Sequence, residues 1–342
     1  MTVNMLVFEY KDTEREFFEN NKFDDFNIIF YEECLNEEFL DKIPQEEKDN
    51  AYVISVFINS SVTKAVVDAF KNLRIIATRS TGYDHIDLKA CQKKNITVLN
   101  VVNYGETSVA QYTFGLIIDL VRNIIPASKM IRCEETNIDD FTGRDLSKMT
   151  LGIVGTGAIG AAVCQYAHAL DMHVLAYDIN PKKELEEKLG LQYMDLDELL
   201  RASDIVTLHI PYTGDNYHMF SKEKFEIMKD GSYFINTSRG EMVDVPALYE
   251  LIERKKIKGA ALDVLTCESE NFSCRSLSEK LGDIPLECRQ EVEFVRKLAQ
   301  FDNVIITPHI AYDTTDSVNY ILEKTMNQIK TVIKGDKTDR IV

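Results

Sequence analysis

Three charged side chains late in the sequence have the types and the placement needed for proton transfer and anion binding. Arg239, Glu268 and His309 each come shortly after an apolar segment that predicts a strand. Ligands of open parallel sheets bind outside the carboxyl ends of the strands, so polar residues at those ends are candidates for a site. Each residue alone also fits a structural role; an arginine beside Gly240, for example, could cap a turn. Their occurrence after three successive predicted strands indicates a shared site.

The chemistry open to these residues is acid–base catalysis on an acidic substrate. Histidine suits proton donation because its ordinary pKa of about 6.5 lies near working pH. A carboxylate beside the imidazole, which Glu268 could supply, would favour the charged ring and fix its orientation. The planar guanidinium of Arg239 could bind a substrate carboxylate through two hydrogen bonds and polarise an adjacent carbonyl.

A glycine-rich segment near the middle of the chain predicts a dinucleotide site. Gly155, Gly157 and Gly160 follow one apolar segment, and Asp178 ends a second, 21 positions after Gly157. The first glycine allows a tight turn, the second lets backbone approach a pyrophosphate, and the third lets helix and strand pack closely. The phosphates would bind at a helix N-terminus. Asp178 would bind the ribose hydroxyls and repel the extra phosphate of NADP, so the expected cofactor is NAD.

The surrounding elements support this interpretation over an ordinary strand-to-helix turn. Residues 149–155, 159–170 and 173–178 predict a strand, a helix and a second strand, which is the context that the motif requires. Further strands are predicted before the motif at residues 5–10, 26–31, 52–57, 75–78 and 96–100, and after it at residues 205–209, 233–237, 259–264 and 304–307. Strands that alternate with helical segments predict parallel sheets covered by helices.

Two long apolar helical patterns are candidates for connections between domains. Residues 107–125 could cross from a first domain into the dinucleotide-binding one, and residues 317–333 could return to the first domain. Residues 268–291 between the last two strands are polar and have no regular pattern.

Length and composition fit a globular protein of two domains. The chain has 342 residues, which is longer than chains that usually fold around a single hydrophobic core. Its formal net charge of −17 argues against nucleic acid and membrane partners, because an acidic surface repels phosphate backbones and anionic lipid. The sequence has neither a run of 18 apolar residues nor a signal peptide, so we expect a cytoplasmic protein.

The cysteine pattern predicts reduced thiols. Seven cysteines lie at positions 34, 91, 133, 164, 267, 274 and 288, without a Cys-x-x-Cys pair. An odd and scattered set of this kind is typical of cytosolic proteins. Cys267 neighbours Glu268, but adjacency in sequence does not make it a nucleophile, and we expect no metal site.

Five segments together make the sequence resemble the D-isomer-specific 2-hydroxyacid dehydrogenases over nearly its whole length. They are Arg79-Ser80-Thr81-Gly82-Tyr83-Asp84-His85-Ile86-Asp87, the glycine-rich segment, Asn236-Thr237-Ser238-Arg239-Gly240, Ala260-Ala261-Leu262-Asp263-Val264 and Thr307-Pro308-His309. The resemblance implies that Arg239, Glu268 and His309 are the catalytic residues. His309 would donate a proton during reduction, and Glu268 would support its protonated state.

The same resemblance implies binding residues that spacing alone does not assign. Backbone N–H groups around Thr81 and Gly82 would bind the substrate carboxylate, Tyr104 would line the pocket, and Phe57 would limit the size of the substrate side chain; we expect Tyr312 to crowd the same pocket. The implied cofactor contacts are Gly155, Gly157, Ala158, Ile159, Gly160, Asp178, Ile210, Pro211, Asn216, Thr237, Ser238 and Asp263, the last toward the nicotinamide carboxamide. Turn and core roles are alternatives for Phe57, Ile210 and Pro211.

The fold implied by the resemblance is α/β, with two Rossmann-like parallel-sheet domains and a cleft between them. One domain would be flavodoxin-like and the other dinucleotide-binding. Residues 1–103 and 311–342 would form the substrate domain, and residues 104–310 the NAD-binding domain. The family also implies a homodimer formed through the NAD-binding domain.

The separation of 41 positions between Glu268 and His309 is similar to that in D-lactate dehydrogenases and vancomycin-resistance lactate dehydrogenases. We therefore expect reversible, NADH-dependent reduction of a short 2-keto acid, with pyruvate favoured, to the D-2-hydroxy acid. One alternative is a bulkier branched or aromatic 2-keto acid, since aromatic pocket walls can stack on an aromatic substrate. A second alternative, from another class, is an NAD-sensing, corepressor-like binding protein that shares this fold.

Overall fold

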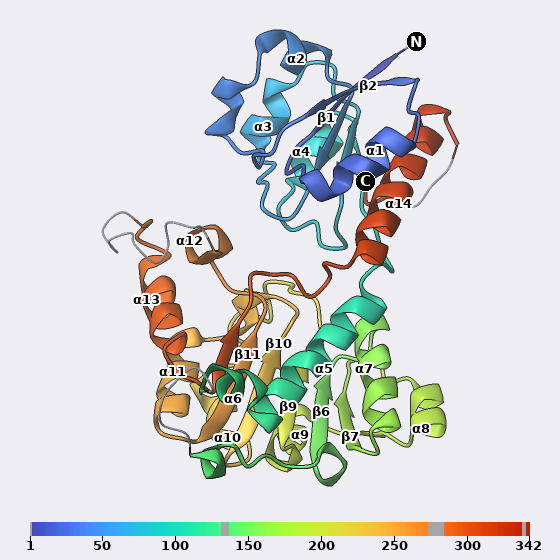
Figure 1. The fold of residues 1–342 in the computed structure, drawn as a ribbon. Coiled ribbons are helices and arrows are strands. Elements are labelled where there is room, and N and C mark those ends of the chain that lie inside the picture. Colours follow the sequence, from blue (N-terminus) through green and yellow to red (C-terminus); the bar gives the residue numbers. More distant parts are fainter. Residues whose placement is uncertain (1, 131–136, 273–283, 337–339) are drawn as a thin grey trace. The chain divides into compact units, whose positions relative to one another are not determined.

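The computed structural model describes residues 2–130, 137–272, 284–336 and 340–342. The chain divides into two compact units (Figure 1). Unit 1 comprises Met1–Tyr104 and Asp313–Val342, and unit 2 comprises Gly105–Tyr312. The sequence places these divisions after residues 103 and 310.

Unit 1 is built on a parallel five-stranded sheet. Its strands are β1 (Val3–Val7), β2 (Phe26–Phe30), β3 (Val53–Val56), β4 (Ile75–Thr78) and β5 (Thr97–Leu99). They are ordered β2-β1-β3-β4-β5, which is the flavodoxin-like order that the resemblance implies. Strands β3 and β4 are buried along their whole length, and this explains why they are nearly continuous apolar segments.

Helices cover both faces of this sheet, as the alternation along β1 requires. Leu6 packs into an apolar cluster on one face, whereas Met5 and Val7 point into the cluster on the other. The helical elements of unit 1 are η1 (Asp12–Glu14), α1 (Arg15–Asn20), η2 (Phe39–Lys42), α2 (Gln45–Asn50), α3 (Lys64–Ala69), α4 (Leu88–Lys93) and α14 (Thr315–Ile333).

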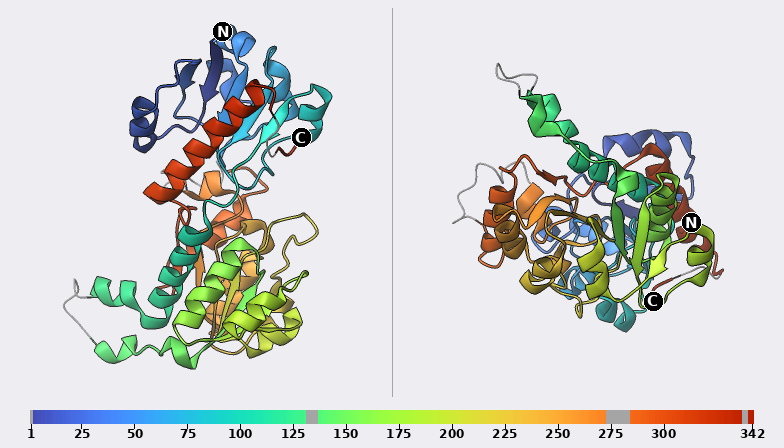
Figure 2. Two further views of the ribbon diagram at one scale, coloured as in Figure 1. Left: turned by 90° about the vertical axis from the view of Figure 1, so that its right-hand side faces the viewer. Right: turned by 90° about the horizontal axis from the view of Figure 1, so that it is seen from below.

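Helix α14 returns to unit 1 as the sequence predicts. It begins where the hydroxyl of Thr314 accepts a hydrogen bond from the N–H of Ser317 at 3.1 Å. It lies along the sheet beside β4 and β5 (Figure 2). Leu322, Met326 and Ile329, at helical spacing, are buried there.

Unit 2 is built on a parallel seven-stranded sheet. Its strands are β6 (Thr150–Val154), β7 (His173–Tyr177), β8 (Gln192–Tyr193), β9 (Ile205–Leu208), β10 (Ser232–Asn236), β11 (Ile257–Leu262) and β12 (Val304–Ile306). The order is β12-β11-β10-β9-β6-β7-β8. The chain changes direction across the sheet between β6 and β9, and ligands of open α/β sheets bind at such a switch point. The two-residue strand β8 is absent from the sequence-based prediction.

The helices of unit 2 form two layers over apolar clusters on opposite faces of the sheet. They are α5 (Glu106–Arg122), α6 (Ile124–Met130), η3 (Ile138–Phe141), η4 (Leu146–Lys148), α7 (Ala158–Ala169), α8 (Lys183–Leu189), α9 (Leu196–Ala202), α10 (Lys222–Ile227), η5 (Gly240–Met242), α11 (Val245–Glu253), α12 (Glu268–Phe272) and α13 (Arg289–Leu298).

Three helices differ from the sequence-based expectation. Residues 107–125 were expected to cross from unit 1 into unit 2. Helix α5 instead lies wholly within unit 2, where it packs against α7, β10 and β11. Helices α12 and α13 form at the two ends of the stretch expected to be irregular, residues 268–291.

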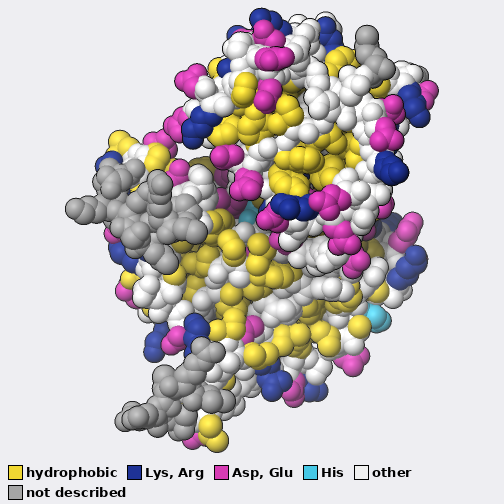
Figure 3. All heavy atoms as spheres, turned by 45° about the horizontal axis from the view of Figure 1, so that its top comes forward, with side chains coloured by type: hydrophobic (Ala, Val, Ile, Leu, Met, Phe, Trp, Pro, Cys, Tyr) yellow, Lys and Arg dark blue, Asp and Glu magenta, His cyan; other side chains and the backbone are white. Residues whose placement is uncertain are grey.

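Charged side chains of both signs are interspersed on the molecular face drawn in Figure 3. None of the helices in the described part of the chain combines the length and the apolar character needed to cross a membrane.

Candidate active site

His309 and Glu268 form a direct pair in unit 2. The Nδ1 atom of His309 lies 2.8 Å from Oε2 of Glu268. The other oxygen of Glu268 accepts a hydrogen bond from the N–H of Leu265 at 3.2 Å. The side chains of the pair are 18% and 21% exposed, so solutes can reach them. Because Nδ1 faces the carboxylate, Nε2 is the ring atom directed toward a ligand.

Asp263 holds the backbone turn that carries His309. The N–H of His309 donates to the carbonyl oxygen of Asp263 at 2.8 Å. The fully buried carboxylate of Asp263 accepts from the hydroxyl of Thr307 at 2.6 Å and from the N–H groups of Ile310 and Ala311 at 3.0 and 2.9 Å.

These bonds offset a strained backbone at His309. Its φ of 53° lies in the left-handed region, which costs an L-residue about 1–2 kcal/mol. Each hydrogen bond to a charged group contributes about 1.5–3 kcal/mol. The bonds to Asp263 are therefore sufficient to hold the turn, and Asp263 positions His309.

Arg239 is positioned by the end of β10. The side-chain amide of Asn236 donates to the carbonyl oxygen of Arg239 at 2.8 Å, and its Oδ1 accepts from the N–H of Ser238 at 2.9 Å. The guanidinium of Arg239 is half-buried and donates to the carbonyl oxygen of Ser238 at 2.8 Å. These bonds fix the loop between β10 and η5.

The loop that carries Arg239 touches the segment that precedes Glu268. A Cβ placed on Gly240 would lie 2.1 Å from the carbonyl carbon of Leu265 and 2.3 Å from the nitrogen of Thr266. This approach of two backbones requires a glycine. The structure therefore brings the segments of Arg239 and Glu268 together, and Glu268 contacts His309 directly.

The glycine-rich segment forms a turn that fits a pyrophosphate. Gly155 has a φ of 94°, and a Cβ there would lie 2.6 Å from the carbonyl oxygen of His209. A Cβ on Gly160 would lie 2.0 Å from the carbonyl oxygen of Gly155, so the start of α7 packs directly on the turn. A Cβ on Gly157 would meet no atom within 4 Å. The backbone beside Gly157 is thus open to a phosphate at the N-terminus of α7, where Ala158 and Ile159 form the first turn.

Asp178 lies directly after β7 and faces this turn. One carboxylate oxygen accepts from the N–H and the hydroxyl of Thr156 at 2.6 and 3.0 Å, and the other from the N–H of Asn180 at 2.8 Å. Burial acts to raise the pKa of Asp178, but the hydrogen bonds from Asn180 and Thr156 and the charge of Lys182 hold it below its ordinary value. Asp178 is therefore ionised and suited to accept hydrogen bonds from ribose hydroxyls.

The remaining expected cofactor residues of unit 2 lie after β9 and β10. The hydroxyl of Ser238 donates to the carbonyl oxygen of Leu208 at 2.6 Å, and Thr237 contacts Thr113 of α5 at 3.1 Å between their hydroxyl oxygens. The amide of Asn216 donates to the carbonyl oxygen of Pro211 at 2.8 Å. These contacts shape the loops around Ile210, and the cofactor roles of the loop residues stay predictions.

Comparisons with known proteins identify the family. Residues 114–311 match the family model described as D-isomer specific 2-hydroxyacid dehydrogenase, NAD binding domain. A 2-hydroxyacid dehydrogenase homolog from Haemophilus influenzae is 31% identical over 344 residues, which cover 99% of this chain and 99% of the relative. The chain belongs to this family.

Two further matches refine the comparison. An aromatic 2-oxoacid reductase from Clostridium sporogenes is 35% identical over 286 residues, covering 82% of this chain and 83% of the relative. The structure of D-lactate dehydrogenase from Aquifex aeolicus, complexed with NAD and lactic acid, matches with a TM-score of 0.84 and 37% identity, covering 97% of this chain and 96% of that one.

These findings confirm the expected family, its D-lactate dehydrogenase-like subgroup, the two α/β parallel-sheet units and the cofactor. The protein is an NAD-dependent oxidoreductase. The glycine turn, the N-terminus of α7 and the ionised Asp178 fit NAD in this dehydrogenase. The roles assigned to individual side chains stay predictions.

The expected substrate residues of the dehydrogenase lie mainly in unit 1. Thr81 and Gly82 follow β4, and the hydroxyl of Thr81 donates to the carbonyl oxygen of Val101 at 2.9 Å. Within the described residues, the backbone N–H groups of Thr81 and Gly82 donate no hydrogen bond. They have the chemistry to bind an anion.

The aromatic residues expected around the substrate have different surroundings. Phe57 is buried directly after β3, with the guanidinium of Arg79 at 5.8 Å from its ring centroid, so its alternative core role stays open. The carbonyl oxygen of Tyr104 accepts from the hydroxyl of Ser317 at 2.9 Å. Tyr312 belongs to unit 2 and is buried, and its ring lies edge-on to that of His309 at a centroid distance of 6.4 Å.

The expectation that the cysteines of the dehydrogenase are reduced thiols is wrong for one pair. Cys267 and Cys288 form a disulfide across 21 positions. Cys34, Cys91 and Cys164 are free, and Cys133 and Cys274 lie outside the described residues. The fold brings the starts of α12 and α13 together, and no spacing motif in the sequence signals this.

Sequence reasoning also missed two residues whose hydrogen bonds hold neighbouring segments together. Thr156 joins the glycine turn to Asp178, although its place between two motif glycines could have indicated it. The buried guanidinium of Arg79 donates to the carbonyl oxygens of Phe8 and Glu9 at 2.8 and 3.1 Å. An arginine directly after a buried strand was the available signal for this second residue.

Proposed function

We propose that this dehydrogenase reduces a short 2-keto acid, with pyruvate preferred, to the corresponding D-2-hydroxy acid. The observation that carries the proposal is the His309–Glu268 pair at 2.8 Å in the unit that matches the NAD-binding family model. The similarity to a D-lactate dehydrogenase complexed with lactic acid supports the choice of a small substrate.

The residues of the chain provide binding and proton transfer. NADH, when bound, supplies the hydride that the carbonyl carbon receives. Protonated His309 donates a proton from Nε2 to the carbonyl oxygen, and Glu268 holds the ring through Nδ1 and stabilises its positive charge. Arg239 binds the substrate carboxylate with its guanidinium and polarises the carbonyl. In unit 1, the backbone N–H groups of Thr81 and Gly82 have the chemistry to bind a carboxylate.

A panel of 2-keto acids tests this proposal. Pyruvate, 2-ketobutyrate, 2-ketoisocaproate and phenylpyruvate are each reduced with NADH, and the product is analysed by chiral chromatography. We expect the highest kcat/KM for pyruvate and a product of D configuration. An L product, or equal turnover of every keto acid regardless of size, would contradict the proposal.

Reduction of aromatic 2-keto acids is the second candidate. The 35% identity to an aromatic 2-oxoacid reductase favours it, and the buried ring of Tyr312 beside His309 could stack on a phenyl group. A kcat/KM for phenylpyruvate above that for pyruvate would select this candidate. Tight NADH binding without turnover of any keto acid would instead select an NAD-sensing binding protein.

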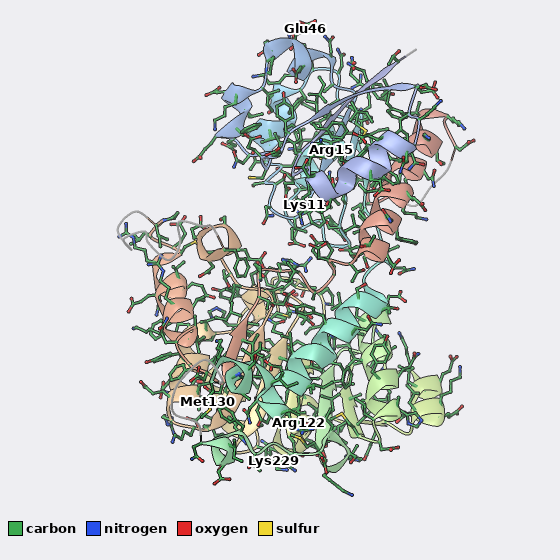
Figure 4. All side chains as sticks on the ribbon, in the orientation of Figure 1. Lys11, Arg15, Glu46, Arg122, Met130 and Lys229 are labelled. Atoms are coloured by element: carbon green, nitrogen blue, oxygen red, sulfur yellow. A yellow bond between two sulfur atoms is a disulfide. The ribbon has the colours of Figure 1, made fainter. Side chains whose placement is uncertain are left out.

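We also propose that the protein forms a homodimer through unit 2. Helix α6 and the adjacent η3 expose Ile124, Ile125 and Ile138, the last at 80%. Figure 4 labels Arg122 at the end of α5 and Met130 at the end of α6, which bracket the first two of these residues. Light scattering after gel filtration should give a dimer that Ile138→Asp weakens; a monomeric wild type would contradict the proposal.

A further inference from the structure

The disulfide of unit 2 lies next to a residue of the proposed catalytic pair. Cys267 immediately precedes Glu268, and Cys288 immediately precedes α13. Their Cα atoms are 5.9 Å apart, and the two residues pack with Ile284 and Val292. Cys267 is half-exposed, whereas Cys288 is 7% exposed. An external thiol can therefore reach the sulfur of Cys267 more readily than that of Cys288.

The conformation of Cys267 sets the first turn of α12. Its φ is 54°, a left-handed conformation that side chains rarely adopt unless the surrounding structure holds them. Its carbonyl oxygen accepts from the N–H groups of Glu270 and Asn271 at 3.2 and 3.0 Å. Glu268 lies inside the turn that these bonds close. A change in the backbone at Cys267 therefore moves the carboxylate that holds His309.

The disulfide is the covalent part of the connection between this segment and α13. A hydrogen bond from the N–H of Thr266 to the carboxyl group of Glu291 also joins the two. Without the disulfide, the left-handed turn at Cys267 depends on hydrogen bonds and side-chain packing, and the backbone can relax toward an ordinary φ.

We propose that Cys267 and Cys288 form a reversible thiol–disulfide exchange site that positions Glu268 and so controls turnover at His309. The disulfide form is the active one, because the Glu268–His309 hydrogen bond is present in it. The reacting partners are dithiols, which reduce the site, and small disulfides such as oxidised glutathione, which restore it. The effect on turnover rests on the proposed function, whereas the exchange reaction itself does not.

The exchange is a balanced two-electron reaction. A thiolate of the external dithiol attacks the sulfur of Cys267, the bond between the two protein sulfurs breaks, and Cys288 leaves as a thiolate that takes up a proton. The second thiol of the reagent then attacks the mixed disulfide and releases Cys267. The protein gains two thiols, and the dithiol becomes a cyclic disulfide.

The experiment compares four states of the full-length protein: wild type and Glu268→Gln, each in disulfide and dithiol form. Mass spectrometry after alkylation establishes the thiol state. Every sample contains EDTA, because the sulfurs of Cys267 and Cys288 and a carboxylate oxygen of Glu270 lie within 4.8 Å of one another and could hold a metal ion after reduction. The measured quantities are kcat, KM for the keto acid and Kd for NADH.

For wild type we expect reduction to lower kcat about tenfold, which is less than the roughly 10²-fold cost of losing a positioned proton donor outright because His309 itself remains in place, and reoxidation to restore it. The Kd for NADH should not change, since the glycine turn and Asp178 are separate elements. Glu268→Gln should have a low kcat that reduction does not lower further. An unchanged kcat in reduced wild type, or an equal fall in wild type and Glu268→Gln, would overturn the proposal.

Serine variants identify the thiols. The double variant Cys267→Ser/Cys288→Ser should have the kcat of reduced wild type, and dithiothreitol should not change that kcat. Cys34→Ser, in unit 1, and Cys274→Ser, outside the described residues, should retain the full response. Loss of the response in Cys274→Ser would assign the exchange to a different pair and contradict the proposal.

Hydrogen exchange separates this proposal from the proposed function. If no keto acid is turned over, the proposed function fails, but the amides of residues 268–271 still report on the site. Faster exchange of these amides in the reduced protein would support the positioning role of the disulfide. Equal exchange in both forms would overturn it.

Discussion

The imidazole of His309 meets the carboxylate of Glu268 at 2.8 Å, although the two residues are 41 positions apart in sequence. The pairing uses Nδ1 and thereby fixes both the rotation of the ring and the nitrogen that is directed to a ligand. It depends on two separate backbone features, the turn held by Asp263 and the first turn of α12. The geometry of a proton donor is thus determined by residues that need not touch a substrate.

Replacement of His309 by alanine should abolish most of the turnover without weakening the binding of NADH. We expect kcat to fall by roughly 10²- to 10⁴-fold, the usual range for loss of a positioned proton donor, while the Kd for NADH stays within twofold. His168→Ala, on the exposed end of α7, is the matched control and should retain wild-type kcat. A His309→Ala variant with near wild-type turnover would remove this residue from the mechanism.

Replacement of Arg239 by lysine should act chiefly on substrate binding. An ammonium group cannot form the two parallel hydrogen bonds that a guanidinium offers to a carboxylate, so we expect KM for the keto acid to rise about tenfold or more. Arg254→Lys keeps the charge of an exposed ion pair with Glu226 and should leave KM unchanged. Steady-state kinetics measure both, and an unchanged KM in Arg239→Lys would count against a role in carboxylate binding.

Replacement of Asp178 by serine should relax the preference for NAD. Two unit charges about 4 Å apart repel by about 4 kcal/mol at an effective dielectric constant of 20, so removal of the carboxylate favours a cofactor with an additional phosphate. We expect the ratio of kcat/KM for NADPH to that for NADH to rise at least about tenfold. Asp197→Ser, which removes an acid paired with Lys224 on the surface, should not change the ratio. No gain with NADPH would show that the ribose contact is misassigned.

The sheets could be predicted because their signal is local. Strands such as β4 and β9 are short, buried and apolar from end to end, so their positions are visible in the sequence alone. Strand β8 lacks this signal, since it consists of only Gln192 and Tyr193 at the sheet edge. Helix α13 was not predicted, because charged residues surround its buried Val292, Val295 and Leu298 and obscure the apolar pattern.

The parts of the site that could not be predicted are those that depend on tertiary contacts. Residue type and strand-end position were enough to select Glu268 and His309. The left-handed backbone of His309, the bonds to Asp263 and the Cys267–Cys288 disulfide arise only when α12 packs against α13 and the segment after β12 reaches Asp263 and Glu268. The acidity of individual carboxyl groups has the same origin, as Glu291 shows.

Burial raises the pKa of Glu291 to about 8, and the charges of Asp244 and Glu241 add to this effect, against a hydrogen bond from the N–H of Thr266. The folded value lies above the ordinary value of 4.5, so the folded state binds the proton more tightly than the unfolded state. Its contribution to stability is full below about pH 4.5 and is lost as the pH rises toward 8, at up to about 1.4 kcal/mol per pH unit.

The variant Glu291→Gln should therefore flatten the pH dependence of stability. We expect the variant to match wild type near pH 5 and to exceed it at pH 8 by on the order of a few kcal/mol. The urea midpoint measured at intervals between pH 5 and 9 tests this. Glu293→Gln removes an exposed carboxylate on the same helix that pairs with Lys297, and its curve should run parallel to that of wild type. If the Glu291→Gln curve also runs parallel to that of wild type, Glu291 is ionised in the folded protein and the buried proton is excluded.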